Sequence, residues 1–106
     1  MSSVRTTPEA DGQARDADVW WRANRPAATD LFVNELFAAF GLLADAPAIG
    51  RPYRRRGIRT LRRLLLRESQ YHVYYIHDAR SDRVVVLAIW SAVRGRGPRL
   101  RVPSAE

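Results

Sequence analysis

The sequence YHVYYIHDARSDRVVVLAIW, at residues 71–90, decides the fold expected for this chain. Residues 71–77 are rich in aromatic and β-branched side chains, which favour a β-strand. The polar segment DARSD, at residues 78–82, is typical of a turn, so residues 83–90 form the second strand of a hairpin. Because the seven residues that follow Arg83 are all apolar, both faces of this strand must be covered. We therefore predict that residues 83–90 lie inside an antiparallel sheet, paired with residues 71–77.

A first helix is predicted near the N-terminus, after a weak strand candidate at residues 2–7. Thr7 is a suitable N-cap and Pro8 fits the first helical position, so the helix begins at Pro8. It ends before Pro26, because the residue that precedes a proline disfavours helical backbone. Its apolar face has helical spacing and consists of Ala10, Ala14, Ala17 and Trp21.

A second helix is predicted to begin at Pro26 and to end at Asp45-Ala46-Pro47. Very few residues join the two helices, so they should form an antiparallel hairpin. We expect their aromatic side chains, including the Trp20-Trp21 pair, to pack in the core or between the helices. The apolar stripe of the second helix consists of Phe32, Leu36, Phe40 and Leu43, widened by Val33 and Phe37.

The remaining segments complete a small α+β domain. Residues 48–56 contain glycine, proline and successive arginines, which is typical of a loop that enters a sheet, and residues 61–67 form a further strand. A basic, extended C-terminal tail is expected at about residues 94–106. The predicted fold is an N-terminal helical hairpin packed on a small antiparallel β-sheet, in a single domain of 106 residues.

The charge distribution indicates an anionic partner. All 18 basic residues are arginines, whose planar guanidinium groups bind phosphate and carboxylate well, and the net charge is +7. Residues 51–106 contain 14 arginines against four acidic residues, a net charge of +10, whereas residues 1–50 carry −3. A basic surface that is simply solvated and has no single partner is the alternative.

The arginines of the second half fall into two segments. Eight lie within residues 51–67, which contain no acidic residue, and four follow Trp90. If both segments border the sheet they form one basic surface, which suits either phosphates or an acidic protein segment. Tyr53, Tyr71 and Tyr74 would then be available to stack on bases. The arginines expected to bind the target or a nucleic acid are Arg54, Arg55, Arg56, Arg59, Arg62, Arg63, Arg94, Arg96 and Arg99.

Motifs of most enzyme classes are missing from the sequence. There is no cysteine, no phosphate-binding glycine loop and no serine-nucleophile motif. His72 and His77, five residues apart on one strand, would face opposite sides of the sheet, so we expect no metal and no cofactor. RNA cleavage without a metal needs proton transfer and positive charge, for which His72, Arg67 and Arg94 are weak candidates.

No segment of the sequence suggests export or membrane insertion. The first 18 residues contain no apolar run of the kind found in signal peptides. The longest apolar run, at residues 84–90, is far shorter than the ~20 residues that span a bilayer. We therefore expect a cytoplasmic protein with no membrane partner.

Motifs in order along nearly the whole chain resemble the toxins of bacterial type II toxin–antitoxin modules, the RelE/ParE superfamily. The most specific are P-x-I-G-R-P at residues 47–52, Y-H-V-Y-Y at residues 71–75 and W-x-x-x-R-G-R at residues 90–96, and the ParE-like branch is the most similar. The resemblance implies a helical hairpin on an antiparallel sheet. It also implies a growth-inhibiting toxin that a co-expressed acidic antitoxin holds inactive by wrapping around it.

The superfamily acts on two kinds of target. RelE-like members cleave mRNA on the ribosome, whereas ParE-like members inhibit DNA gyrase and are not nucleases. The nucleases typically carry an arginine, a second arginine and a tyrosine at three positions where this chain has His72, Arg94 and Leu100, so only Arg94 matches. In addition, Ser91 replaces a histidine that is common in ParE-like relatives. The resemblance thus implies a ParE-like toxin that binds DNA gyrase and forms a hetero-oligomer with its antitoxin. The alternatives are a ribosome-dependent endoribonuclease and a non-catalytic basic module that binds nucleic acid.

Overall fold

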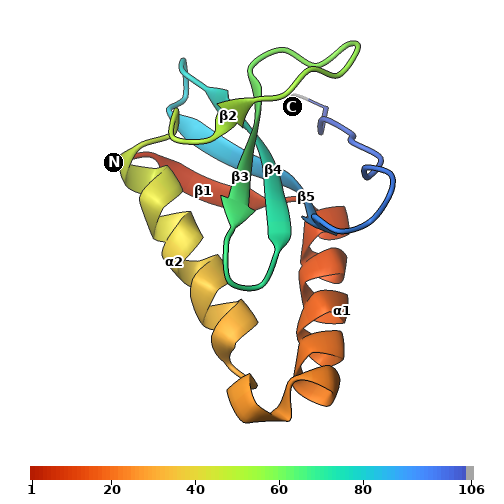
Figure 1. Cartoon of the computed structure of the whole chain (residues 1–106). Coiled ribbons are helices and arrows are strands. Elements are labelled where there is room, and N and C mark those ends of the chain that lie inside the picture. The colour runs from red at the N-terminus through yellow and green to blue at the C-terminus, as the bar shows by residue number, and fades with distance from the viewer. Residues whose placement is uncertain (105–106) are drawn as a thin grey trace.

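Two α-helices pack on a five-stranded sheet in the computed structural model, which describes residues 1–104 (Figure 1). The strands lie in the order β1-β5-β4-β3-β2, and this α+β arrangement confirms the predicted fold class. Along the chain the elements are β1 (Ser3–Thr6), α1 (Pro8–Asn24), the short 3-10 helix η1 (Pro26–Ala28), α2 (Leu31–Asp45), β2 (Arg51–Pro52), β3 (Leu61–Leu66), β4 (Tyr71–Asp78) and β5 (Arg83–Ser91).

The predicted hairpin is present, and its second strand lies inside the sheet. β4 and β5 pair in antiparallel fashion, and β5 is flanked on its other side by β1. The register shifts at Tyr74, where Leu87 is an additional residue on β5, so the residues of β5 that face the core change from Val84 and Val86 to Ile89. The uninterrupted apolar run tolerates this bulge, because each residue that the bulge moves to another face is still apolar.

β1 is the exception to the antiparallel arrangement. Its four residues pair in parallel with β5, from Ser3 opposite Arg83 to Thr6 opposite Val86. A parallel pair requires a long crossover connection, and here the two helices and three other strands supply it. The backbone N–H of Ser2 donates to the carbonyl of Ala44 at 2.8 Å, which brings the end of α2 back to the start of β1.

α1 begins and ends where the sequence predicts. The side-chain oxygen of Thr7 accepts a hydrogen bond from the N–H of Ala10 at 3.1 Å, and Pro8 is the first helical residue. The expected small-residue face is packed, with Ala10, Ala17 and Trp21 buried. This face lets α1 lie close against β5.

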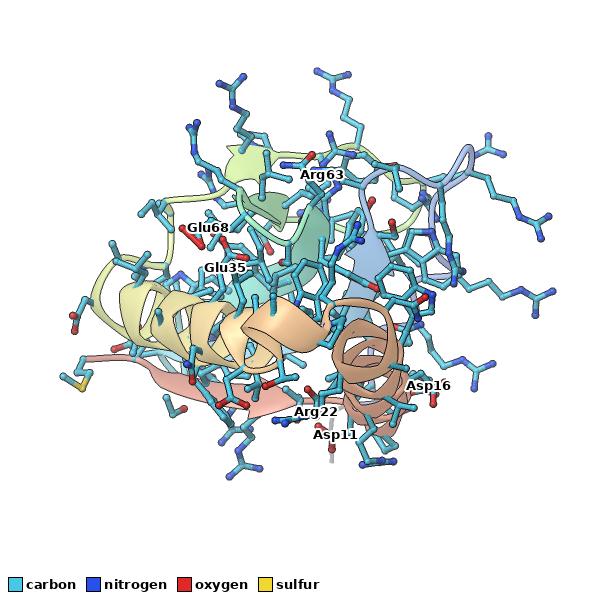
Figure 2. All side chains as sticks on the ribbon, turned by 60° about the horizontal axis from the view of Figure 1, so that its bottom comes forward. Asp11, Asp16, Arg22, Glu35, Arg63 and Glu68 are labelled. Atoms are coloured by element: carbon cyan, nitrogen blue, oxygen red, sulfur yellow. The ribbon has the colours of Figure 1, made fainter. Side chains whose placement is uncertain are left out.

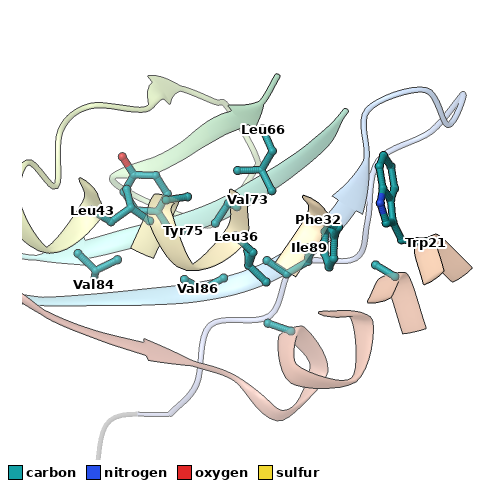
Figure 3. Close-up of a cluster of buried hydrophobic side chains, with 13 residues drawn as sticks. Trp21, Phe32, Leu36, Leu43, Leu66, Val73, Tyr75, Val84, Val86 and Ile89 are labelled. Atoms are coloured by element: carbon teal, nitrogen blue, oxygen red, sulfur yellow. The ribbon is translucent and has the colours of Figure 1, made fainter. Parts of the chain in front are cut away.

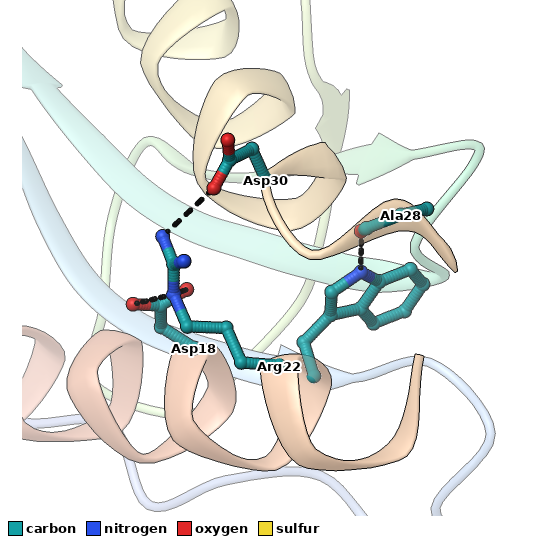
Figure 4. Close-up of polar contacts among 5 residues, drawn as sticks. Asp18, Arg22, Ala28 and Asp30 are labelled. Carbon is teal, nitrogen blue, oxygen red and sulfur yellow. Dashed lines mark hydrogen bonds and ion pairs between the residues drawn. The ribbon is translucent and has the colours of Figure 1, made fainter. Parts of the chain in front are cut away.

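α2 begins later than predicted, at Leu31, because residues 26–28 form η1 instead. The indole N–H of Trp21 donates to the carbonyl of Ala28 at 2.8 Å and so fixes this connection (Figure 4). The guanidinium of Arg22 contacts both Asp18 and Asp30 at 3.1 Å, which further links α1 to the start of α2.

Two aromatic predictions are wrong. Phe37 is 65% exposed and Trp20 is 47% exposed, although both were expected to be packed. Each is a sequence neighbour of a buried residue, Leu36 or Trp21, and so lies about 100° around the helix from the buried stripe. Of the other predicted stripe residues of α2, Phe32, Leu36 and Leu43 are buried, whereas Phe40 and Val33 are partly buried.

The core lies between the helices and the sheet (Figure 3). Tyr75 is completely buried within it, and its hydroxyl donates to the carbonyl of Pro47 at 2.6 Å and accepts from the N–H of Gly50 at 2.9 Å. A Cβ at Gly50 would lie 2.7 Å from that hydroxyl, so only glycine fits. The motif at residues 47–52 is therefore a loop that is fastened to the core by one tyrosine.

Replacement of Tyr75 by phenylalanine should lower the free energy of unfolding by about 1–3 kcal/mol, because two backbone groups lose their partner. Urea denaturation of both proteins measures the difference. Tyr71→Phe is the control, since no hydrogen bond of the Tyr71 hydroxyl is found within residues 1–104. Equal loss in the two variants would show that the Tyr75 hydrogen bonds do not stabilise the loop.

The turn between β3 and β4 is held by α2. The carboxylate of Glu35 accepts hydrogen bonds from the backbone N–H of Glu68 at 2.8 Å and of Ser69 at 2.9 Å, and from the Ser69 hydroxyl at 2.7 Å. Glu35 and Glu68 are therefore close to each other in Figure 2.

Within the described residues, no helix is both long and apolar enough to cross a membrane.

Candidate functional site

The sheet face that points away from the helices carries a small cup of about 190 Å³. Side chains alternate along a strand, so His72 and Tyr74 of β4 point to this face while Val73 and Tyr75 point to the core. The neighbouring strand contributes Arg63. The wall of the cup also includes Tyr53, Trp90, Ser91, Arg94, Arg96 and Gly97.

Arginine and aromatic side chains stack against each other in this cup. The guanidinium of Arg63 lies 4.7 Å from the ring centre of Tyr53 and 5.9 Å from that of Tyr74. The guanidinium of Arg94 lies 4.1 Å from the ring centre of Trp90. Such cation–π contacts hold the two positive charges in place. No aspartate or glutamate lines the cup within residues 1–104, so its charge is positive.

The C-terminal segment runs along this face and is tied to it at two points (Figure 1). The indole N–H of Trp90 donates to the carbonyl of Arg96 at 2.8 Å. The guanidinium of Arg55 donates to the carbonyl of Pro98, which is buried, at 3.1 Å. The two arginine segments are thus neighbours in space. Residues 105 and 106 of the expected tail lie outside the described residues.

The surroundings of His72 favour its neutral form. Burial lowers the pKa of its imidazole below the ordinary value, and the positive charge of Arg63 lowers this pKa further. Its ring centre lies 5.9 Å from that of Tyr74. Among the described residues of the cup, His72 alone carries a side chain of the type that titrates between pH 5 and 8. Within the described residues, the cup therefore combines one side chain of the type that titrates near neutral pH with at least two fixed positive charges.

Acidification should destabilise the protein through His72. Its pKa is lower in the folded state than the value of about 6.5 expected when unfolded, so its contribution to stability is complete above pH 6.5. That contribution is lost as the pH falls from 6.5 through the folded pKa. The urea midpoint of the wild type should therefore fall more between about pH 7.5 and pH 5 than that of His72→Gln. Parallel pH curves for the two proteins would contradict this assignment.

The other titrating groups are the same in the wild type and in His72→Gln, so their effects cancel in the difference between the two curves. A hydrogen bond from the backbone of Arg80 lowers the pKa of Asp78, and a hydrogen bond from Ser2 lowers the pKa of Asp82. Both carboxylates thus stay ionised throughout the pH range in which His72 titrates.

The structure separates the predicted site arginines into three groups. Arg63 and Arg94 lie at the cup with His72, and Arg96 borders it. Arg55 and Arg62 point inward, the latter donating to the carbonyl of Gly50 at 2.7 Å. The remaining members are exposed, and Arg67 lies beside the β3–β4 turn, away from the cup. The exposed set consists of Arg54, Arg56, Arg59, Arg67 and Arg99.

The prediction that three tyrosines are available to stack on bases is wrong for two of them. Tyr74 is only 2% exposed. Tyr71 faces the helices, where its ring centre lies 4.9 Å from that of Phe32. The ring of Tyr53 is half-buried and packs edge-on against Tyr74 at 5.2 Å. Alternation along β4 places Tyr71 and Tyr74 on opposite faces of the sheet.

A groove between α2 and β3, of about 830 Å³, was not predicted. Leu42 is 50% exposed, Ile49 45% and Leu65 38% along it, and Arg51, Arg63 and Arg67 also border it. The sequence contains a signal for this groove, because Leu65 falls on the other side of β3 from Leu64 and Leu66. Glu35 and Glu68 line the groove as well, so three arginines face two glutamates there. Its exposed apolar side chains suit a partly apolar protein segment.

A second groove, of about 740 Å³, lies between α1, the β3–β4 turn and the end of β5. It contains the exposed Trp20 and Val93, together with Arg25 and Arg94. Within residues 1–104, no three histidine, aspartate or glutamate side chains cluster as a metal site would require.

Comparisons with known proteins agree with this fold. Three similar solved structures are the chromosomal ParDE system from P. aeruginosa, the intact RelBE toxin–antitoxin complex of E. coli and the RelBE2 toxin–antitoxin complex from Mycobacterium tuberculosis. The P. aeruginosa chain has a TM-score of 0.70 at 16% identity, over 86% of this chain and 96% of that one. The E. coli chain has a TM-score of 0.59 at 18% identity, over 89% of this chain and 100% of that one. The M. tuberculosis chain has a TM-score of 0.61 at 24% identity, over 86% of this chain and 92% of that one. At these identities the likeness shows the fold alone.

The sequence itself carries the family assignment. No curated protein matches the chain. A family model described as the ParE toxin of the type II toxin–antitoxin system, parDE, matches residues 4–95 and confirms the resemblance that the motifs indicated. Because this match extends over most of the chain, the protein belongs to the ParE toxin family of type II toxin–antitoxin systems.

Proposed function

We propose that this protein inhibits growth by binding DNA gyrase, and that it does so without cleaving nucleic acid. The family assignment supports a toxin, and the composition of the cup supports binding without cleavage. A gyrase inhibitor needs a complementary surface but no set of catalytic groups. The basic C-terminal half, with its net charge of +10, supplies such a surface for a target that handles DNA.

The observation that carries this proposal is that His72 is the one side chain lining the cup, within residues 1–104, of a type that titrates near neutral pH; the hydroxyls of Tyr53 and Tyr74, which also line it, ordinarily titrate near pH 10. Cleavage at an RNA 2′-hydroxyl needs one group that removes a proton, another that donates one, and positive charge on the phosphate. His72 can perform one proton transfer, and Arg63 and Arg94 supply positive charge. Within the described residues, neither a carboxylate nor a second histidine lines the cup to perform the other transfer.

A ribosome-dependent endoribonuclease is the second candidate, and one observation favours it. His72 and Arg94 come from different strands or segments, yet they border the same cup, and Arg63 adds a further charge beside them. A phosphate that enters this cup would meet all three side chains. Arg67, the third weak candidate from the sequence, does not border the cup.

We also propose that an acidic antitoxin, produced with this protein in the cytoplasm, neutralises it in a hetero-oligomer. Two of the similar solved structures are toxin–antitoxin complexes by description. The groove between α2 and β3 supports a protein partner here, because its leucine and isoleucine side chains are exposed. Three arginines against two glutamates leave its border with a net charge of +1.

The test compares the two targets with the same purified protein. Supercoiling of relaxed plasmid by gyrase should be blocked, and the antitoxin should restore it. Primer extension on mRNA from translating ribosomes should show no cuts that depend on the protein. Cuts that vanish in His72→Ala, together with unaffected supercoiling, would establish the endoribonuclease instead.

A further inference from the structure

We propose that this toxin also binds double-stranded DNA directly, by contacts from exposed arginines to the phosphate backbone. The contacts come from an arginine rim, which we define as Arg54, Arg56, Arg59, Arg96 and Arg99. The inference rests on the proposed function, because gyrase itself acts on a DNA duplex. In this arrangement the rim contacts the DNA, and other surfaces of the toxin contact gyrase.

The loop between β2 and β3 is built to present three of these side chains. Its ends are joined by the N–H of Tyr53, which donates to the carbonyl of Leu61 at 3.0 Å. At the tip, the N–H of Ile58 donates to the carbonyl of Arg55 at 3.2 Å, and Gly57 adopts a φ of +81° that suits glycine. Arg54, Arg56 and Arg59 are exposed on this loop.

Arg55, between two rim residues, has a different role. Its guanidinium points inward and donates to Pro98 at 3.1 Å and to the Tyr53 hydroxyl at 3.4 Å. A Cβ at Gly97 would lie 3.3 Å from the same guanidinium, so the C-terminal segment passes close to it. Arg55 thus joins the loop to the segment that carries Arg96 and Arg99.

Within residues 1–104, no carboxylate forms an ion pair with an arginine of the rim. Among residues 1–104, the ion pairs of arginine with carboxylates are those of Arg22 with Asp18 and Asp30, on the helical side. In Figure 2, guanidinium groups extend into solvent from the side of the β2–β3 loop and the C-terminal segment, whereas Asp11 and Asp16 lie on α1. An unpaired row of arginines attracts a polyanion over a long range.

The chemistry of the rim favours phosphates over an acidic protein. A protein interface is organised around buried apolar side chains. Within the described residues, no large apolar side chain of residues 50–60 is exposed, and those exposed in the C-terminal segment are the separate Val93 and Val102. The exposed apolar side chains of the two grooves are available to protein partners instead.

A duplex fits the rim better than a single strand. Proteins that bind single strands stack the bases on exposed aromatic rings. Next to the rim, Tyr74 is 2% exposed and Tyr53 is packed between Tyr74 and the guanidinium of Arg63. With no free ring to stack on, the arginines are left to contact backbone phosphates, which fix a position but read no sequence.

The experiment measures binding of the purified, full-length protein to a short fluorescent DNA duplex, without gyrase, between about 50 and 200 mM salt. The triple variant R54Q/R56Q/R59Q should flatten the slope of log K against log salt by about 2.7, since each lost phosphate contact removes about 0.9. The control R5Q/R15Q/R80Q loses the same charge from exposed arginines elsewhere and should keep the wild-type slope.

Three outcomes would overturn this inference. The first is that the wild type fails to bind the duplex. The second is that the slope falls equally in both triple variants. The third is that R54Q/R56Q/R59Q keeps its affinity for DNA and loses only its affinity for the antitoxin. Because no gyrase is present, failure here is separate from failure of the proposed function. A protein that blocks supercoiling but does not bind DNA would refute the DNA contact alone. One that binds DNA with the expected slope but spares gyrase would refute only the gyrase target.

Discussion

Expression of this protein alone should stop bacterial growth, and co-expression of the acidic antitoxin should restore it. The expectation follows from membership of the ParE toxin family and from the basic surface of the C-terminal half. Growth curves and colony counts after induction measure it. Soluble, folded protein that leaves growth unchanged would contradict the proposed activity.

Two glycine variants separate loss of fold from loss of activity. Gly50→Ala should abolish growth inhibition, because the new Cβ would lie 2.7 Å from the buried Tyr75 hydroxyl. Gly41→Ala should retain it, since a Cβ there has no atom within 4 Å and alanine favours a helix. If wild type and Gly41→Ala are both inactive, Ser91 becomes the first suspect. Ser91 borders the cup, and Ser91→His tests whether it weakens the toxin.

Ribosomes that translate in the presence of the purified protein should keep their mRNA intact. A general acid and a general base each raise the rate of such a reaction by about 10²–10⁴-fold. The cup holds one histidine, whereas the reaction needs two proton transfers. His72→Ala should therefore leave growth inhibition unchanged, as should Arg94→Ala if the cup has no catalytic role. Loss of toxicity in both variants, together with wild-type mRNA cuts, would contradict the binding mechanism.

Local sequence signals predicted the hairpin and the caps of α1 correctly. An apolar run of seven residues defines β5, and Thr7 with Pro8 defines the start of α1, because these features act over a few neighbouring residues. The parallel position of β1 could not be predicted in this way. Ser3 lies opposite Arg83, and that pairing depends on how the whole helical unit returns the chain.

The start of α2 and the exposure of Phe37 depend on tertiary contacts. Trp21 holds the carbonyl of Ala28, seven residues away, and so delays the helix to Leu31. Phe37 belongs to the apolar pattern of α2, yet Ala39 occupies the buried position nearer the sheet. Hydrophobic periodicity describes a broad face, whereas packing selects which residues of that face are covered.

The candidate site was predicted in composition but not in arrangement. The sequence identified a basic surface, and the structure divides its arginines into those of the cup, those that fasten loops and those that are exposed. Arg55 and Arg56 are neighbours with different roles, because Arg55 reaches Pro98, 43 residues later. No pattern of adjacent residues encodes that contact.

Gyrase-catalysed supercoiling of a relaxed plasmid, with increasing amounts of the purified protein, shows whether gyrase is the target of this toxin. We expect that supercoiling stops, that excess antitoxin restores it, and that His72→Ala inhibits gyrase as well as the wild type does. Supercoiling that proceeds normally with a saturating excess of folded protein would contradict the claim that this toxin acts on gyrase.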